Sequence, residues 1–431
     1  MDLNIILISN GPGEMSTWVK PLMAMLRKAL PAARVVIALV PCPHSSGQEK
    51  AYSERLHGAY TLTPEDTLHY LLTGQLPKGL ALAKTGIILQ LGGDLLFGVS
   101  FKWRTGYPLT VYTEHLVQWK RQVSRFYFKH RKDYETHQKR LRPGQGVYVG
   151  DLMRDAVKVQ ALPLEIRQKL KLRDQAPVVA LLPGSKPLKV LYTTAFFMKL
   201  VDEISLLMPQ VQFILLQSPF TPLTQLRNAV QDPKYIQVLK GSAAKIVHHS
   251  AGTALVTPQG NQVQIIEPSA NYAAMQVADL SLTLPGTNTA ELAALGCPMM
   301  VLLPLQQPEL LPLDGILQHL GRIPWFGKRL KRRLVLSHLK KIPYLALPNQ
   351  KAQRMIVPEY RGELYVEALA TEAVKLLEDP LQRREMRQAL RQTMPEDRSA
   401  SLVCLDLIAL LENHSAEFAR YYRAEAQESI F

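Results

Sequence analysis

The chain alternates short apolar segments with segments of helical spacing, and it does so in two successive sets. In the first set, Thr17–Leu30 has helical spacing, and strand-like segments lie at Asn4–Ser9, Arg34–Val40, Gly86–Leu91 and Leu109–Thr113. Alternation of this kind predicts a parallel sheet whose strands are joined by crossover helices.

The second set follows a stretch at 162–177 that contains prolines and charges. It predicts helices at Tyr192–Met208, Ala270–Ala278 and Thr289–Leu295, and strands at Val178–Leu182, Gln212–Gln217, Gln264–Ile266 and Leu280–Leu284. Two consecutive α/β sets predict two Rossmann-like domains. A length of 431 residues agrees, because single cores stop growing at roughly 250–300 residues. We place the domains at 1–160 and 176–360, and a closing set of C-terminal helices at 361–431.

Composition narrows the class of protein. Hydrophobic residues make up 47% and charged residues 20%, as in soluble globular proteins. The three cysteines form no metal-ligand pattern, which favours a reducing cytoplasm without structural zinc. The N-terminal residues do not resemble a signal peptide, and no apolar run reaches about 18 residues, so we expect any membrane contact to be peripheral.

The formal net charge of +15 is concentrated in two windows. Residues 119–142 contain nine Lys and Arg against two acids, and residues 322–341 contain eight with no acid. Localised basicity points to a specific anionic surface or ligand.

Three turns between a strand and a helix are candidate ligand loops. They are Ser9–Glu14, Leu182–Lys186 and Leu284–Glu291. Glycine permits close approach of the backbone, and the first amides of a helix attract anions. The alternative for the first turn is an ordinary tight turn, and for Glu291 an acid favoured in a first helical turn.

Several spaced motifs resemble those of the lipid-A-disaccharide synthase family, mainly in the C-terminal half. Residues 182–185 resemble its LPGS segment, and 286–291 with 296–299 resemble its GTAxxE and PM signature. Residues 344–349, 352, 354 and 357–359 are similar to YxSLPNxxAGRxxVPE, and residues 149, 150, 153 and 155 to IGHxMxD.

This resemblance implies a GT-B fold, in which two Rossmann-like domains face a cleft, and inverting hexosyl transfer from a UDP-sugar to a lipid-linked acceptor. UDP-sugar is then a substrate, and no cofactor or metal is required. It implies a basic, catalytic contact at Lys186 and donor contacts at Gly286, Thr287, Asn288, Thr289, Glu291, Asn349 and Arg354. The acceptor side would include Asn10, Gly11, Gly13 and Glu14.

Inverting transfer needs a base that removes the acceptor proton. Asp94 is the candidate, because it directly follows an apolar strand at the position of the aspartate in the family's IDAPDF segment. Strand ends of this kind carry ligand sites in open α/β sheets. The alternative is that Asp94 only caps the next turn, in which case Glu14 or His115 would be the base.

Three positions depart from the family pattern. Lys186 replaces an arginine, Asp151 replaces the histidine of IGHxMxD, and Ser9–Glu14 stands in place of AGExSGD. Lysine lacks bidentate phosphate recognition. A related enzyme with a changed substrate is therefore an open alternative.

The basic segments predict a membrane contact. Apolar and aromatic residues between 316 and 345 alternate with Lys328, Arg329, Lys331, Arg332 and Arg333, a pattern that suits an anionic lipid surface. Residues 119–142, with Phe126, Tyr127 and Phe128 among the cations, are expected on the same face. We therefore expect a cytoplasmic protein held peripherally at the inner (plasma) membrane. A solvated helix over the core is the alternative.

Two rival functions stay open. One is another GT-B activity on a UDP-sugar, including chemistry like that of UDP-GlcNAc 2-epimerase. The other is nucleic-acid binding, suggested by a pI near 9.6 but unsupported by any motif, so we expect no nucleic-acid partner. A homodimer is among the assemblies that the sequence allows.

Overall fold

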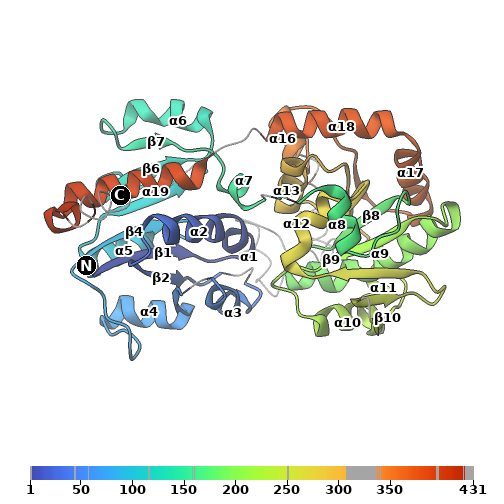
Figure 1. The fold of residues 1–431 in the computed structure, drawn as a ribbon, viewed down its shortest axis with the longest axis horizontal. Helices are drawn as coiled ribbons and strands as arrows, with labels where there is room; N and C mark the ends of the chain where they lie inside the picture. Colours follow the sequence, from blue (N-terminus) through green and yellow to red (C-terminus); the bar gives the residue numbers. More distant parts are fainter. Residues whose placement is uncertain are drawn as a thin grey trace. The chain divides into compact units, whose positions relative to one another are not determined.

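The computed structural model describes residues 2–42, 45–56, 58–114, 117–157, 159, 161–249, 252–306, 337, 339, 341–394, 398–420 and 422. The chain divides into two compact units, which are described separately (Figure 1). Unit 1 contains Met1–Ala156 and Glu396–Phe431, and unit 2 contains Val157–Pro395. The chain therefore returns to its first unit at the C-terminal end.

Unit 1 is built on a parallel sheet. Its strands in the described residues are β1 (Leu3–Ser9), β2 (Arg34–Leu39), β3 (Tyr60–Leu62), β4 (Thr85–Gln90), β5 (Leu109–Thr113), β6 (Val123–Phe128) and β7 (Gly146–Tyr148). They pair in the order β3-β2-β1-β4-β5-β6-β7. The chain builds outward from β1 in one direction and then from β4 in the other. The carboxyl ends of all these strands meet at one edge of the sheet.

Helices complete unit 1. They are α1 (Pro12–Glu14), the π-helical η1 (Met15–Val19), α2 (Lys20–Ala29), α3 (Glu49–Glu54), α4 (Pro64–Thr73), α5 (Leu95–Thr105), α6 (Arg131–His137), η2 (Gln138–Arg140), α7 (Leu152–Ala156) and α19 (Ser399–His414). Every residue of β1 is buried, as expected for a central parallel strand covered on both faces.

Unit 2 contains a second, mixed sheet. Its strands are β8 (Val178–Leu182), β9 (Gln212–Leu216), β10 (Lys245–His249), β11 (Gly252–Val256), β12 (Gln262–Ile266), β13 (Leu280–Thr283), β14 (Met299–Pro304) and β15 (Glu359–Gly362). The order is β10-β11-β12-β9-β8-β13-β14-β15, and β11 pairs antiparallel with both β10 and β12. The order reverses between β8 and β13, so these neighbours are the switch point of this sheet.

The helices of unit 2 follow the strands in the usual alternation. They are α8 (Pro163–Lys169), α9 (Pro187–Leu207), α10 (Leu223–Gln231), α11 (Pro233–Val238), η3 (Pro268–Ala270), α12 (Asn271–Val277), α13 (Thr287–Leu295), α16 (Leu347–Ala352), α17 (Val366–Glu378) and α18 (Pro380–Thr393). Helix α17 packs against α9, and α18 packs against α13.

The last long helix, α19, belongs to unit 1, where it packs against α2 and α7. Asp155 accepts a hydrogen bond from the Ala400 amide at 2.8 Å, at the start of this helix. Further along, Asp406 accepts one from the Tyr127 hydroxyl at 2.8 Å and pairs with Arg125 at 3.2 Å. Burial, together with the Asp406 charge, raises the pKa of Tyr127 well above its ordinary value. These contacts hold α19 against the sheet.

The strands predicted from the sequence are all present, with ends shifted by at most two residues. Other strands were not predicted, among them β6, whose Arg125 interrupts the apolar pattern and is accommodated by Asp406. Among the described residues, no helix has the length and apolar character needed to cross a membrane.

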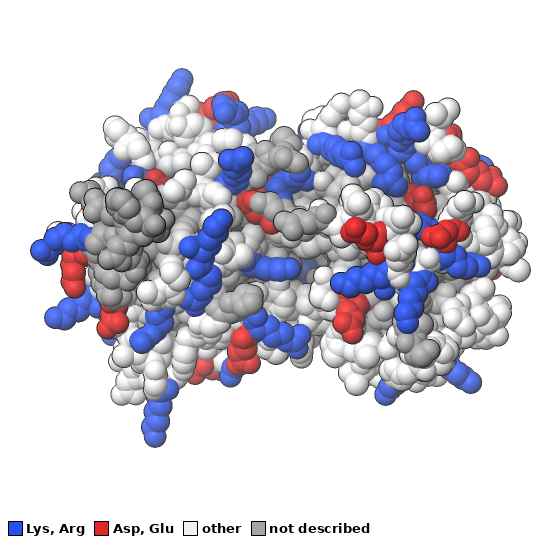
Figure 2. Space-filling model, in the orientation of Figure 1, with Lys and Arg blue, Asp and Glu red and all other residues white. Residues whose placement is uncertain are grey.

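The expected lipid-facing role of the aromatic residues in 119–142 is wrong. Phe126, Tyr127 and Phe128 are fully buried in unit 1, because they belong to the interior strand β6. Basic side chains are nevertheless widely distributed on the face of the molecule drawn in Figure 2. The predicted contact residues Lys328, Arg329, Lys331, Arg332 and Arg333 lie outside the described residues.

Candidate active site

Two loops meet at the switch point of the unit 1 sheet. The loop after β1 contains Asn10, Gly11 and Glu14, and the loop after the neighbouring strand β4 contains Gly92–Asp94. Gly92 approaches Glu14 so closely that a Cβ there would lie 1.7 Å from Oε2 of Glu14. Glycine at position 92 is therefore what lets the two loops pack together.

The Glu14 carboxylate is held inside the β1 loop. Its Oε2 accepts hydrogen bonds from the Asn10 amide at 3.2 Å and from the Ser9 hydroxyl at 3.3 Å. Burial raises the pKa of Glu14 to about 7, against the opposing effect of these hydrogen bonds and with a smaller contribution from the charge of Glu114. A carboxyl group with this pKa can hold or release a proton near neutral pH.

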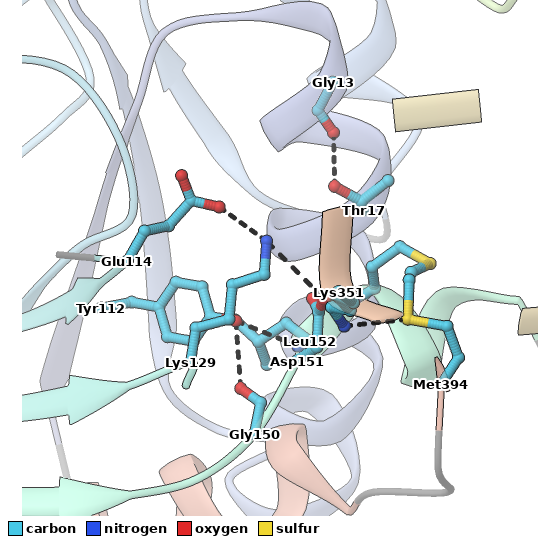
Figure 3. A network of polar contacts seen from close by, with 11 residues as sticks. Gly13, Thr17, Tyr112, Glu114, Lys129, Gly150, Asp151, Leu152, Lys351 and Met394 are labelled. Atoms are coloured by element: carbon cyan, nitrogen blue, oxygen red, sulfur yellow. Dashed lines mark hydrogen bonds and ion pairs between the residues drawn. The ribbon is translucent and has the colours of Figure 1, made fainter. Parts of the chain in front are cut away.

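Gly13 anchors the irregular start of the first helical segment. Its carbonyl accepts a hydrogen bond from the Thr17 hydroxyl at 2.7 Å (Figure 3). It also accepts one from the Ser16 hydroxyl at 3.1 Å. The π-helical turn follows at once. Such turns occur often at functional sites.

Asp94 is the exposed N-cap of α5. Its Oδ1 accepts the Leu96 amide at 2.8 Å, so the capping role considered from the sequence is present. The buried Gln90 donates from Nε2 to the Asp94 carbonyl at 2.8 Å and accepts the Gly98 amide at 2.9 Å. Gln90 thus fixes the loop, and capping uses only one carboxylate oxygen of Asp94.

An ionic network lies beyond the next strands of the same sheet (Figure 3). Lys129 follows β6, and its ammonium lies 2.6 Å from Glu114 and 3.6 Å from Asp151. It also lies 5.6 Å from the centre of the Trp18 ring. The two carboxylates raise the pKa of Lys129 although burial alone would lower it. Asp151, which stands where the motif IGHxMxD has histidine, therefore forms an ion pair with Lys129.

Two loops also meet at the switch point of the unit 2 sheet. Lys186 is the partly exposed N-cap of α9 after β8, and Gly286 is the N-cap of α13 after β13. Lys189, in the first turn of α9, donates to the Pro285 carbonyl at 3.3 Å and so joins the loops. Gly286 and Thr287 are exposed. Exposed helix-start amides beside lysines form a surface suited to phosphate.

Asn349 and Glu359 organise the chain beside α13. Glu359 accepts the amides of Leu345 and Ala346 at 2.8 Å each. The fully buried Asn349 donates to Glu359 at 2.7 Å and to the Val357 carbonyl at 2.8 Å, and its Oδ1 accepts two further amides. These contacts give Asn349 a positioning role, because they occupy the whole side-chain amide.

Thr289 connects this segment to the helix start. Its hydroxyl donates to the Gly286 carbonyl at 2.8 Å and accepts the Leu347 amide at 3.1 Å. Of the remaining predicted donor contacts, Asn288 is partly exposed on α13 and Arg354 is exposed in the turn after α16.

Glu291 lies in α13 and is almost fully buried. Its Oε1 accepts a hydrogen bond from the Tyr272 hydroxyl at 2.9 Å. Tyr272 therefore orients the carboxylate. Within the described part of the chain, no group of three or more His, Cys, Asp or Glu has the arrangement of a metal site.

Comparison with known proteins agrees with these motifs. The profile of the family "Lipid-A-disaccharide synthetase" matches residues 143–256, which include the segments around Asp155 and Ser185. Lipid-A-disaccharide synthase 2 of Legionella pneumophila (strain Lens) is 26% identical over 272 residues, 62% of this chain and 58% of its own. The lipid-A-disaccharide synthase of Pseudomonas putida (strain KT2440) is 28% identical over 259 residues, 59% of this chain and 56% of its own.

Over the matched part of its length, the chain is similar to the lipid-A-disaccharide synthase family. The match spans less than two thirds of the length of these relatives. Among solved structures, S. aureus MnaA in complex with UDP aligns with a TM-score of 0.53 at 9% identity, covering 96% of this chain and 97% of MnaA. The chain has the GT-B fold expected from its motifs.

The segments of this chain that resemble the family's motifs have visible structural roles. The segment like IGHxMxD contributes Asp155, which holds α19, and the segment like YxSLPN to VPE forms the network around Asn349. Nothing in the sequence pattern singles out Gln90, Lys129 or Lys189. A buried glutamine and lysines next to helix starts carry no pattern of their own. The strand order brings Gln90 and Lys189 to the two switch points, and it brings Lys129, after β6, to Glu114 and Asp151.

The raised pKa of Glu14 predicts a pH-dependent stability. Folding favours the protonated form of this carboxyl group, because its pKa is higher in the folded state. Its contribution to stability is therefore complete at pH values below the ordinary pKa of 4.5 and is lost as pH rises through the folded-state pKa of about 7. Glu14→Gln mimics the protonated form. We therefore expect the midpoint of thermal unfolding of Glu14→Gln to increase relative to that of the parent as pH rises from about 5 to 8. A constant difference in midpoint over this range would contradict the assignment.

Proposed function

We propose that the chain is an inverting glycosyltransferase that moves a hexosyl unit from a UDP-sugar to a lipid-linked acceptor. Formation of a lipid A disaccharide is the specific reaction proposed. Unit 2 would bind the donor, and unit 1 would bind the acceptor. The activity named for the relatives supports this reaction class, and the two switch-point sites support the division of roles.

The observation that carries the proposal is the paired loop site of unit 2. The exposed start of α13 lies beside the Pro285 carbonyl, which accepts a hydrogen bond from the Lys189 ammonium. A diphosphate would accept hydrogen bonds from the first amides of α13, with Lys186 and Lys189 as cations from α9. Together, these amides and lysines would stabilise the negative charge that develops on UDP as it departs. The similarity of this chain to MnaA in its complex with UDP concerns the fold alone.

The proposed reaction is a direct displacement. An acceptor hydroxyl oxygen forms a bond to the anomeric carbon, while the bond from that carbon to the diphosphate oxygen breaks and its electron pair leaves with UDP. The hydroxyl proton passes to Asp94, whose capping bond occupies one oxygen and leaves the other for the acceptor. Glu14, Asn10 and Gly11 would shape the acceptor side of the same switch point.

Glu291 is proposed to bind the ribose hydroxyls of the donor. Tyr272 donates a hydrogen bond to Oε1 of this carboxylate, and a ribose hydroxyl would donate to the same carboxylate. Glu291→Ala should therefore weaken UDP binding by a few kcal/mol at most, because the helix amides stay in place. Calorimetric titration with UDP measures this. Tyr272→Phe should weaken binding less, because it only loosens the carboxylate, and unchanged affinity in Glu291→Ala would remove the assignment.

Product analysis tests the proposed function. The purified chain is incubated with a panel of UDP-hexoses and a monosaccharide lipid acceptor. We expect UDP and a glycosylated lipid in which the transferred hexose has the anomeric configuration opposite to that in the donor. Mass spectrometry and nuclear magnetic resonance identify both products. Epimerised UDP-sugar with no lipid product would instead support the rival epimerase-like chemistry.

A further inference from the structure

Charged side chains follow five neighbouring strands of the unit 1 sheet. In the strand order β1-β4-β5-β6-β7, they are Glu14, Asp94, Glu114, Lys129 and Asp151. Because these strands are parallel, their carboxyl ends meet at one edge of the sheet. Glu14 and Asp94 belong to the proposed acceptor side. The other three lie beyond Asp94 along the same edge, and the proposed reaction gives them no role.

The Lys129 ammonium lies between two carboxylates (Figure 3). It is 2.6 Å from Glu114 and 3.6 Å from Asp151, and the partly exposed Trp18 ring lies beside it. The side chains of Lys129 and Asp151 are 13% and 7% exposed, whereas that of Glu114 is 46% exposed. Lys129 is therefore shielded from solvent, and Glu114 is the member of this group that a solute reaches most readily.

Backbone contacts anchor this group. The Lys129 amide donates to the Thr113 carbonyl at 3.1 Å, at the end of β5 and directly before Glu114. Asp151 is held from another element, because its Oδ1 accepts the Met153 amide at 3.1 Å at the start of α7. With Lys129 and Asp151 fixed in this way, the ion pair holds the Glu114 carboxylate in a defined place.

Stability alone does not account for a buried lysine at this edge. A buried ion pair contributes little net stability, because both charges lose their water on burial. The pair of Lys129 with Asp151 also belongs to a departure from the family pattern, since the motif IGHxMxD has histidine at position 151. Glu114 lies near the acceptor side, because its charge adds to the larger effect of burial in raising the pKa of Glu14. A departure at this place fits an altered contact with the acceptor.

We propose that Glu114 binds hydroxyl groups of the acceptor sugar and that Lys129 is the residue that positions it. Neighbouring strands lie about 4.8 Å apart, so the end of β5 before Glu114 is one strand from the end of β4 before Asp94. A hexose ring spans a similar distance. One of its hydroxyl groups would meet Asp94 while another donates a charge-assisted hydrogen bond to Glu114.

The charges at this edge select the substrate class. Glu14, Asp94 and Glu114 disfavour a phosphate group on the part of the acceptor that they contact, so this part is an uncharged, hydroxylated ring. The inference rests on the proposed function, because it takes the acceptor to be a sugar.

Saturation-transfer nuclear magnetic resonance with methyl β-glucoside, methyl β-galactoside and methyl β-N-acetylglucosaminide tests binding with no donor present. At least one of these hexosides should bind the parent chain, and Glu114→Gln should weaken that binding about 10–100-fold. Glu372→Gln is the matched control, because it removes an ion pair of 2.8 Å with Lys375 in unit 2 and should leave binding unchanged. In the transfer reaction, Glu114→Gln should raise the acceptor KM while the donor KM stays the same.

Two variants separate positioning by Lys129 from a merely structural role. Lys129→Arg keeps the cation and should retain most of the hexoside binding. Lys129→Met/Asp151→Asn removes both buried charges and keeps a side chain that can cap α7, so its circular dichroism and thermal midpoint should stay close to those of the parent. Its hexoside binding should nevertheless be about 10-fold weaker, because Glu114 is no longer held.

The results distinguish this inference from the proposed donor site. Equal hexoside binding by Glu114→Gln and the parent would overturn the inference, and so would a parent chain that binds UDP but none of the methyl hexosides. Parent-like binding by the folded Lys129→Met/Asp151→Asn variant would remove the positioning role of Lys129. Hexoside binding that depends on Glu114, in a chain that binds no uridine nucleotide, would support the sugar contact while contradicting the donor site.

Discussion

Asp94→Asn should slow glycosyl transfer about 10²–10⁴-fold while donor affinity hardly changes. The substitution keeps the size and the capping ability of the side chain, because asparagine is also a favourable N-cap. It removes the basicity that the proposed proton transfer requires. The effect should therefore fall on the rate rather than on UDP-sugar binding, as expected for a group that acts mainly in the transition state.

The structure offers a matched control for the cap. Asp232 caps α11 by accepting the Lys234 amide at 2.9 Å, close to the 2.8 Å contact of Asp94 with the Leu96 amide. Asp232→Asn makes the same chemical change at a cap distant in sequence and outside both proposed sites. It should leave turnover unchanged.

Two results would contradict the assignment of Asp94. Retained turnover in Asp94→Asn would mean that another group is the base, and Glu14, whose pKa of about 7 suits proton transfer, would be the first candidate. His115, the other candidate from the sequence, lies outside the described residues. Parallel loss of folding stability and turnover would show that Asp94 is structural. Single-turnover rates, donor affinities and thermal midpoints distinguish these cases.

Gly286→Ala should weaken UDP binding about 10–100-fold. Gly286 has φ 149° and ψ −166°, a combination open almost only to glycine, and alanine there costs of order 1–3 kcal/mol. A Cβ would meet no atom within 4 Å, so the cost is backbone strain rather than a clash. The start of α13 would relieve this strain by moving, and the amides proposed to hold the diphosphate would move with it.

Gly260→Ala provides the matched control for backbone strain. Gly260 also has a positive φ, 86°, and open space around its Cβ position, but it lies in the turn between β11 and β12. Both variants should lose some stability, whereas only Gly286→Ala should lose UDP affinity. Equal UDP affinity of Gly286→Ala and the parent would show that the start of α13 does not bind the diphosphate.

The architecture of the chain could be predicted from the sequence because its central strands are buried on both faces. Segments such as Asn4–Ser9 and Val178–Leu182 are therefore almost continuously apolar. Peripheral strands gave weaker signals: β3 has only three residues, and the exposed β10 contains Lys245 and two histidines. Their strand conformation depends on pairing with a neighbouring strand. β3 pairs in parallel with β2, and β10 pairs antiparallel with β11.

The candidate site was partly predictable for a related reason. Turns such as Ser9–Glu14 and Leu284–Glu291 are visible in the sequence because glycine interrupts the pattern between strand and helix. The roles of individual side chains were not visible. Burial of Asn349 and the contacts of Lys129 with Glu114 and Asp151 arise from tertiary packing, which composition and spacing do not report.

Calorimetric titration with uridine nucleotides tests the central claim most directly. UDP and at least one UDP-sugar should bind the parent chain with one site, ADP and GDP should bind much more weakly, and Glu291→Ala and Gly286→Ala should each reduce the affinity for UDP. If no uridine nucleotide binds the folded parent chain, the assignment of a UDP-sugar donor site to unit 2 is wrong.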